Sequence, residues 1–202
     1  MNSVLERVYE IGIIPVIAFN SVDEAIPLCK ALMDGGLPAA EVTFRTACAE
    51  ECIKKIHEEL PNMLLGAGTV LTVDQADRAM AAGASFIVAP GFDPEVCKHV
   101  IDKGGIMMPG TATSGEMQQA MNMGCEVVKN GGVDKLKNIG AALKTCKWMC
   151  TGGVNAKNVN NYLGYNQIIA VGGTWMCKSD KIKAGAWDEI TAMSKEAVNV
   201  ML

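Results

Sequence analysis

Short apolar runs rich in β-branched residues recur along the chain at a nearly constant spacing. Eight such runs begin 20 to 26 residues apart, with amphipathic segments between them. Each run is almost continuously apolar, which is typical of parallel strands that are covered by helices. The runs are IIPVIAF (13–19), AAEVTF (39–44), MLLGAG (63–68), SFIVAP (85–90), GIMMPG (105–110), CEVVK (125–129), KWMCTGG (147–153) and IIAVGG (168–173).

The segments between the runs have the features of helices. Several open on a Ser, Thr, Asp or Asn that can cap a helix, and several close on glycine. Residues 184–201 predict a closing helix, and residues 2–11 predict an extra helix at the N-terminal mouth. Eight alternating units in 202 residues predict an α/β fold, a single (β/α)8 TIM barrel with this extra N-terminal helix, as one domain over 1–202.

A doubly wound open sheet is the alternative architecture. That fold often carries a G-x-G-x-x-G turn after its first strand. Here the first run ends in FNSVDE instead, and eight units are more than such a sheet usually needs. The pattern therefore favours the barrel.

Charge and hydropathy limit the partners and the location that we expect. The net charge of −4 and the pI near 5.2 argue against nucleic acid or an anionic membrane as the main partner. The first residues lack a signal-peptide pattern, and no apolar stretch approaches the roughly 18 residues that span a bilayer. We expect a soluble, cytoplasmic protein.

Eight cysteines do not form a recognisable framework. The sequence holds no C-x-x-C pair, and its two histidines are His57 and His99. A zinc site would need closer Cys/His spacing. We therefore expect no metal, and most cysteines should pack as small apolar residues.

Glu41, Thr43 and Arg45 alternate along the second run, so they share one face of the strand while Val42 and Phe44 take the other. If Val42 and Phe44 face the helices, a carboxylate and a guanidinium point into the barrel. Buried charges are paired or functional. One interpretation is an internal salt bridge that orders the barrel; the other gives Glu41 proton transfer and Arg45 anion recognition.

Two glycine pairs follow the last two runs, in TGG (151–153) and GGT (172–174). Glycines allow backbone N–H groups to approach an anion closely. Phosphate sites of these barrels often lie after the seventh and eighth strands. The pairs therefore predict a phosphate site, with ordinary tight turns as the alternative.

Lys129 ends the sixth run and is followed closely by Gly131 and Gly132. It could be the first solvated residue of a loop. At the C-terminal end of a barrel strand, however, it would stand where catalytic groups lie. A lysine amine can attack a carbonyl and form a Schiff base. Together with a carboxylate, a guanidinium and a phosphate site, this predicts aldol cleavage of a phosphorylated keto acid.

These residues give the chain a family resemblance from about residue 4 to its end. It resembles the bacterial 2-keto-3-deoxy-6-phosphogluconate (KDPG) aldolases, which include bifunctional 4-hydroxy-2-oxoglutarate (KHG) aldolases. The motifs are IPVI (14–17), GG-x-x-x-x-EVT-x-RT (35–46), GAGTVL (66–71), APG (89–91), PG-x-x-T (109–113), EVVK (126–129), TGG (151–153) and VGGTW (171–175).

The resemblance implies a class I aldolase of the Entner–Doudoroff pathway that needs no metal or other cofactor and assembles as a homotrimer. Lys129 would be the Schiff-base lysine and Glu41 the proton shuttle, while Arg45 and Thr69 would hold the pyruvate carboxylate. The other implied contacts are Gly152, Gly153, Gly173 and Thr174 with the phosphate, and Pro90 and Thr151 with the substrate.

One segment departs from the family pattern. The family usually continues after its lysine with a segment like FFPAEA, whereas here Lys129 is followed directly by Asn130 and the glycines, which makes the connection about six residues shorter. Either the protein has lost a loop or the sequence omits a segment. The alternative functions are another phosphate-binding barrel enzyme, such as a sugar-phosphate epimerase, and a non-catalytic binder of phosphorylated ligands.

Overall fold

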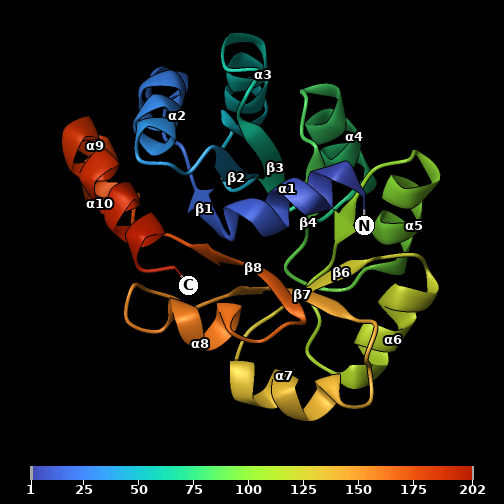
Figure 1. The fold of residues 1–202 in the computed structure, drawn as a ribbon. Coiled ribbons are helices and arrows are strands. Elements are labelled where there is room, and N and C mark those ends of the chain that lie inside the picture. Colours follow the sequence, from blue (N-terminus) through green and yellow to red (C-terminus); the bar gives the residue numbers. More distant parts are fainter. Residues whose placement is uncertain (1, 202) are drawn as a thin grey trace.

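The computed structural model describes residues 2–201, and every predicted apolar run contributes a strand to one parallel sheet (Figure 1). The strand order is β5-β4-β3-β2-β1-β8-β7-β6. The strands are β1 (Ile13–Ile17), β2 (Ala39–Thr43), β3 (Leu64–Gly68), β4 (Phe86–Val88), β5 (Met107–Met108), β6 (Val127–Asn130), β7 (Lys147–Thr151) and β8 (Ile168–Gly173).

The two edge strands, β5 and β6, meet through a single bridge that closes the ring. Gly110 pairs with Lys129 in parallel register. The Lys129 N–H donates to the Pro109 carbonyl at 2.8 Å, and the Thr111 N–H donates to the Lys129 carbonyl at 2.9 Å. The predicted (β/α)8 barrel is confirmed, and the doubly wound alternative is excluded.

Helices follow the strands and cover the outside of the barrel (Figure 1). They are α1 (Ser3–Ile11), α2 (Ala25–Asp34), α3 (Ala49–Glu59), α4 (Val73–Ala81), α5 (Pro94–Asp102), α6 (Ser114–Asn122), α7 (Val133–Gly140), α8 (Val159–Leu163), α9 (Ser179–Lys183) and α10 (Trp187–Asn199), with a 3-10 turn, η1 (Val22–Glu24), before α2.

Side-chain caps start several of these helices where the sequence predicts them. Thr72 accepts from the Gln75 N–H at the start of α4, and Thr113 and Glu116 form a capping box at α6. The closing helix expected over 184–201 is confirmed as α10, which begins at Trp187. A short helix, α9, ends before Gly185, whose φ of 62° breaks the path before α10 begins.

The apolar core has two parts, one inside the barrel and one between the strands and the outer helices. Helix α1 crosses the N-terminal end of the barrel, as predicted for residues 2–11 (Figure 1). Its Leu5 and Val8 are buried against the inner core. Inner-core residues from the strands include Ile14, Leu64, Phe86, Met108 and Met149.

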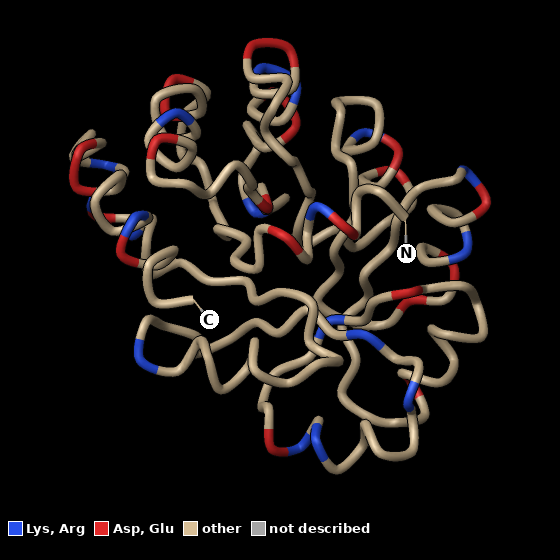
Figure 2. Tube along the Cα trace, viewed as in Figure 1, with Lys and Arg blue, Asp and Glu red and all other residues tan. Residues whose placement is uncertain are grey.

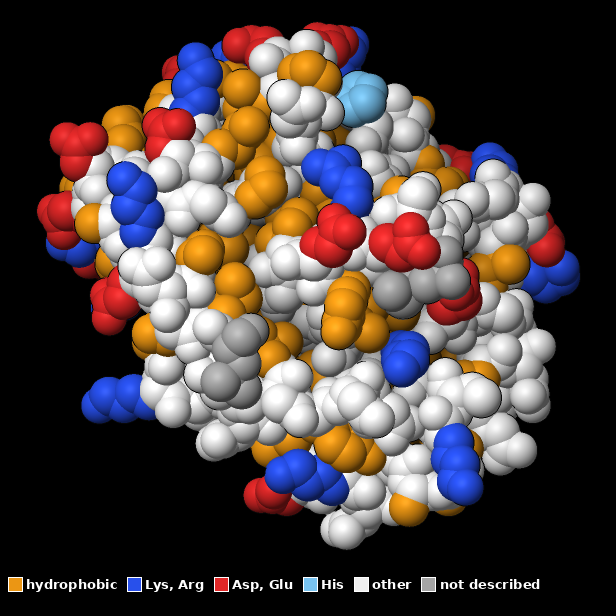
Figure 3. Space-filling model, in the orientation of Figure 1, with side chains coloured by type: hydrophobic (Ala, Val, Ile, Leu, Met, Phe, Trp, Pro, Cys, Tyr) orange, Lys and Arg blue, Asp and Glu red, His pale blue; other side chains and the backbone are white. Residues whose placement is uncertain are grey.

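Charged residues lie mainly on the outer helices (Figure 2). Acidic, basic and apolar side chains are interspersed on the face that α1 crosses (Figure 3). Among residues 2–201, no helix combines the length and the apolar character that crossing a bilayer requires. The cysteines are free thiols and pack as predicted: Cys48 is half-buried and the other seven are buried.

Candidate active site

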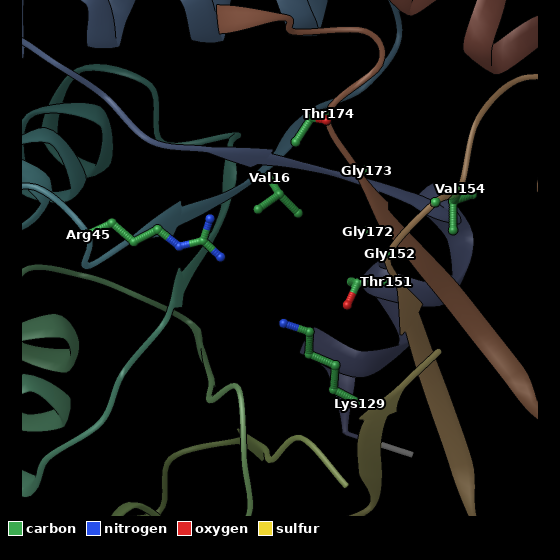
Figure 4. A pocket seen from close by; sticks show the side chains of 10 residues that line it. Val16, Arg45, Lys129, Thr151, Gly152, Val154, Gly172, Gly173 and Thr174 are labelled. Atoms are coloured by element: carbon green, nitrogen blue, oxygen red, sulfur yellow. The ribbon is translucent and has the colours of Figure 1, made fainter. Parts of the chain in front are cut away.

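A cavity of about 270 Å³ opens at the C-terminal ends of β1, β6, β7 and β8 (Figure 4). Most of the residues that sequence reasoning selected meet there. The lining residues are Val16, Arg45, Lys129, Thr151, Gly152, Gly153, Val154, Gly172, Gly173 and Thr174.

Lys129 stands on β6 between β7 and the bridge to β5. Its backbone is held on one side by register with Met149 and on the other by Pro109 and Thr111. The Thr111 hydroxyl also donates to the Lys129 carbonyl at 3.2 Å. The half-buried side chain extends into the cavity toward Arg45, beside the hydroxyl of Thr151 (Figure 4).

Arg45 enters the cavity from the segment that follows β2, and Thr69 orients it. The Arg45 Nε–H donates to Thr69 Oγ1 at 3.0 Å. Thr69 has a φ of 56°, a left-handed conformation that is a true outlier for a β-branched residue. Such strain persists where the surroundings hold it, often at functional sites. Thr69 does not line the cavity itself; its hydroxyl group holds the guanidinium group of Arg45, which does.

Glu41 lies inside the barrel, below the residues that line the cavity. It is 1% exposed, and its Oε2 has no hydrogen-bond partner among residues 2–201. Burial raises the pKa of Glu41, while the charges of Lys129 and Arg45 oppose that rise. Lys129 and Arg45 are therefore the cations that favour the ionised form of this carboxyl group.

Gly68, on β3, makes the room that Glu41 occupies. A Cβ at position 68 would overlap the Glu41 carboxyl group. Sequence reasoning missed this role, although a glycine inside a strand often marks a close approach of another group. Val16 and Val154 were also missed as lining residues, whereas Gly172 belongs to a predicted glycine pair and leaves space for the side chains of Val16 and Thr151.

Gly152 and Gly153 form the rim after β7. Their φ angles are 100° and 72°, so this turn requires glycine. No atom beyond their immediate chain neighbours lies within 4 Å of where a Cβ would be, so both glycines border open space. The amides of Asn155 and Asn158 donate to the Gly153 carbonyl at 3.2 and 2.9 Å and fix the loop.

Gly173 has a different role after β8. The ring of Trp175 occupies the space that a Cβ at Gly173 would need. The indole therefore packs on the backbone that leads to Thr174 and holds it at the rim.

Pro90 does not join the other predicted residues. It is exposed on the connection after β4 and lines neither this cavity nor its neighbour. The Pro90 carbonyl instead packs against Gly110. It occupies the space that a Cβ at position 110 would need.

A second cavity of about 400 Å³ adjoins the first at Val16, Arg45 and Thr174, which line both. It extends toward the connection between β8 and α9. Lys178, Ser179 and Asp180 line this second cavity but not the first. The mouth of the barrel is therefore larger than the cavity around Lys129 alone.

The chain is similar to known aldolases over nearly its whole length. Residues 4–193 match a family model described as KDPG and KHG aldolase. A 2-dehydro-3-deoxy-phosphogluconate aldolase of Treponema pallidum (strain Nichols) is 37% identical over 207 residues, covering 100% of this chain and 99% of the relative. That alignment is longer than this chain of 202 residues, so the relative carries residues that this chain lacks.

Two crystal structures resemble the fold closely. KDPG aldolase of Legionella pneumophila, with pyruvate captured at low pH as a covalent carbinolamine intermediate, has a TM-score of 0.90 and 33% identity, covering 95% of this chain and 96% of that chain. The 2-keto-3-deoxy-6-phosphogluconate aldolase of Zymomonas mobilis ZM4 with 3-phosphoglycerate has a TM-score of 0.87 and 32% identity, covering 96% of this chain and 94% of that chain.

Proposed function

The chain belongs to the KDPG and KHG aldolase family, and on this basis we propose that it is a class I aldolase, a carbon–carbon lyase. Its reaction is the reversible cleavage of 2-dehydro-3-deoxy-6-phosphogluconate to pyruvate and glyceraldehyde 3-phosphate. The observation that carries this proposal is one cavity that contains Lys129, Arg45 and the glycines after β7 and β8. These are an amine, a carboxylate-binding cation and a backbone cradle for phosphate.

The substrate binds between the two ends of this cavity. Arg45, oriented by Thr69, forms an ion pair with the substrate carboxylate. Gly152, Gly153, Gly173 and Thr174 surround the phosphate, with Thr151 beside the reacting carbon. The C2 carbonyl then lies at Lys129.

Imine formation is the first chemical step. The Lys129 amine attacks C2, its nitrogen releases a proton and the carbonyl oxygen takes one up, which gives a carbinolamine. Loss of that oxygen as water, with a second proton supplied by Glu41 through a water molecule, leaves an iminium at C2. The positive iminium can accept an electron pair from C3.

Cleavage uses that electron sink. Glu41, again through water, removes the proton from the C4 hydroxyl group, and the C3–C4 bond breaks. The electron pair of this bond forms the enamine, and the aldehyde leaves. Glu41 returns its proton to C3, and water then hydrolyses the pyruvyl iminium, which releases pyruvate and the free amine.

Further features of the function follow from family membership. We propose a cytoplasmic homotrimer that needs no metal and works on carbohydrate acids in the Entner–Doudoroff pathway. Cleavage of 4-hydroxy-2-oxoglutarate is a second activity that we include in the proposal. It needs the same Lys129 amine and the same binding of the substrate carboxylate by Arg45.

Borohydride reduction in the presence of pyruvate tests the assignment of Lys129. We expect mass spectrometry to find a reduced pyruvyl group on Lys129 and on no other lysine. Lys129→Ala should lose activity by several orders of magnitude, because the covalent route is removed. Labelling at another lysine, or none, would refute the assignment.

The same experiment separates the alternative functions. A sugar-phosphate epimerase would turn over without trapping an imine. A non-catalytic binder would hold phosphorylated ligands without releasing pyruvate. Both alternatives fail if parent protein releases pyruvate and is inactivated by borohydride only when pyruvate is present.

A further inference from the structure

The second cavity at the mouth adds charge to a site whose phosphate cradle is otherwise neutral. Three cationic side chains line the two cavities among residues 2–201: Arg45, Lys129 and Lys178. Of these two cavities, Lys178 lines only the second. It lies on the same connection as Thr174, which lines both.

The charge of the substrate, which rests on the proposed function, calls for a third cation. The substrate carries one carboxylate and a phosphate group of about −1.5 to −2 near neutral pH. Arg45 pairs with the substrate carboxylate, and the Lys129 nitrogen is covalently bonded in the imine. Glycine backbone supplies hydrogen bonds to the phosphate but no formal charge. Lys178 is the remaining cation, and it lies on the connection that also carries Thr174.

The backbone at Lys178 is held in place at the mouth. The two residues before it, Met176 and Cys177, are buried, and the Cys177 thiol contacts the Val16 carbonyl at 3.8 Å. The Lys178 carbonyl accepts from the N–H groups of Lys181 and Ile182 at the start of α9. The exposed side chain therefore leaves a fixed point beside the second cavity.

The ammonium group of Lys178 is available for a ligand. Among residues 2–201 it takes part in no ion pair, whereas its neighbour Lys181 is bound to Glu189 at 2.6 Å. Asp180 lines the same cavity and would repel an anion that moved away from Thr174. Lys178 thus attracts an anion in this cavity, and Asp180 repels one.

The geometry points to Lys178 as a specificity-determining residue that binds the substrate phosphate from the side of the second cavity. Lysine binds phosphate as a mobile point charge, so it can follow the phosphate without a rigid fork. Asp180 limits the phosphate to the Thr174 side. The pair sets the preference of the enzyme for phosphorylated over unphosphorylated keto acids.

Lys178 also lines an outer cavity of about 420 Å³ together with Trp175, Met193 and Glu196. If the Lys178 ammonium group bound a ligand in this outer cavity instead, substitution of Lys178 would leave phosphate binding unchanged. Lys157 lines the outer cavity and neither of the two at the mouth, so Lys157→Met is a matched control.

The test compares Lys178→Met, Asp180→Asn and Lys157→Met in steady-state cleavage. We expect Lys178→Met to raise KM for 2-dehydro-3-deoxy-6-phosphogluconate about fivefold to tenfold, the effect of one partly solvated charge on a phosphate, with little change in kcat. Asp180→Asn should lower this KM. Neither should alter KM for unphosphorylated 2-dehydro-3-deoxygluconate, and Lys157→Met should match the parent on both.

A binding measurement keeps this inference separate from the proposed reaction. Titration calorimetry with inorganic phosphate should give weaker binding for Lys178→Met than for the parent, with a smaller dependence on salt concentration. Equal affinity in the two proteins would overturn the role of Lys178 even if Lys129 forms the imine. Failure of imine formation would refute the proposed reaction and leave the phosphate result standing on its own.

Discussion

Glu41 is a buried carboxyl group whose ionisation the folded structure disfavours. Its carboxyl group is almost fully buried and Oε2 has no partner among residues 2–201. Desolvation disfavours the ionised form, which is why the pKa rises in spite of Lys129 and Arg45. A carboxyl group that holds its proton more tightly than usual is suited to exchange that proton with a substrate.

We predict that Glu41→Gln separates binding from turnover. The variant should still form the pyruvyl imine at Lys129, because attack and dehydration can use water. Its cleavage rate should fall about 10²–10⁴-fold, the usual span for a lost general acid–base group. Single-turnover kinetics with borohydride trapping measures both steps. Cleavage at the parental rate would place the proton shuttle elsewhere.

The same substitution should change how stability depends on pH. Because the pKa of Glu41 is raised in the folded state, the folded protein keeps a proton that the unfolded chain releases above the ordinary value of 4.5. The stabilising contribution is present below that pH and declines as the pH rises toward the folded pKa. Urea unfolding over a pH series should show this decline in the parent and lose it in Glu41→Gln.

Among the structural elements, the connections after β7 and β8 use glycine for different physical reasons. Gly153 needs its left-handed conformation and faces open space, whereas Gly173 needs its missing side chain under Trp175. Gly153→Ala should therefore distort only the cradle and weaken phosphorylated substrates more than 4-hydroxy-2-oxoglutarate. Gly173→Ala should also lower the melting temperature. Equal losses on both substrates for Gly153→Ala would mean that the loop only shapes the barrel.

The β6–α7 connection is the shortest of those that follow the strands. Only Gly131 and Gly132 join β6 to α7, whereas residues 152–158 join β7 to α8. The turn is satisfied locally, because Asn130 accepts from the Gly131 N–H and donates to the Thr111 carbonyl, both at 2.6 Å. Intact-mass measurement should return 21.4 kDa if the short connection belongs to the protein. A heavier chain would show that a segment is missing there.

For the molecule as a whole, α1 completes the inner core. Leu5 is buried against strands from several parts of the barrel, whereas Tyr9 on the same helix is 58% exposed. Leu5→Ala should reduce the free energy of unfolding by about 2–5 kcal/mol because it leaves a cavity. Tyr9→Ala should change it little. Denaturant unfolding measures both, and KM should stay at the parental value in each variant because α1 lies at the opposite end from the mouth.

The sequence by itself determined the strands, the barrel and the strand ends at which chemistry lies. This was possible because the spacing of apolar runs and the alternation of Glu41, Thr43 and Arg45 are local patterns that backbone geometry converts directly into strands and faces. Lys129 could be selected in the same way, from its position at the end of a run.

Only the tertiary structure decided which of these strand-end residues share a cavity. It left Pro90 outside, paired Gly68 with the carboxyl group of Glu41, and joined Lys178 to Arg45 and Thr174 across a second cavity. Each of these features depends on strand register and on contacts between residues far apart in the chain, and such contacts leave no periodic signal in the sequence.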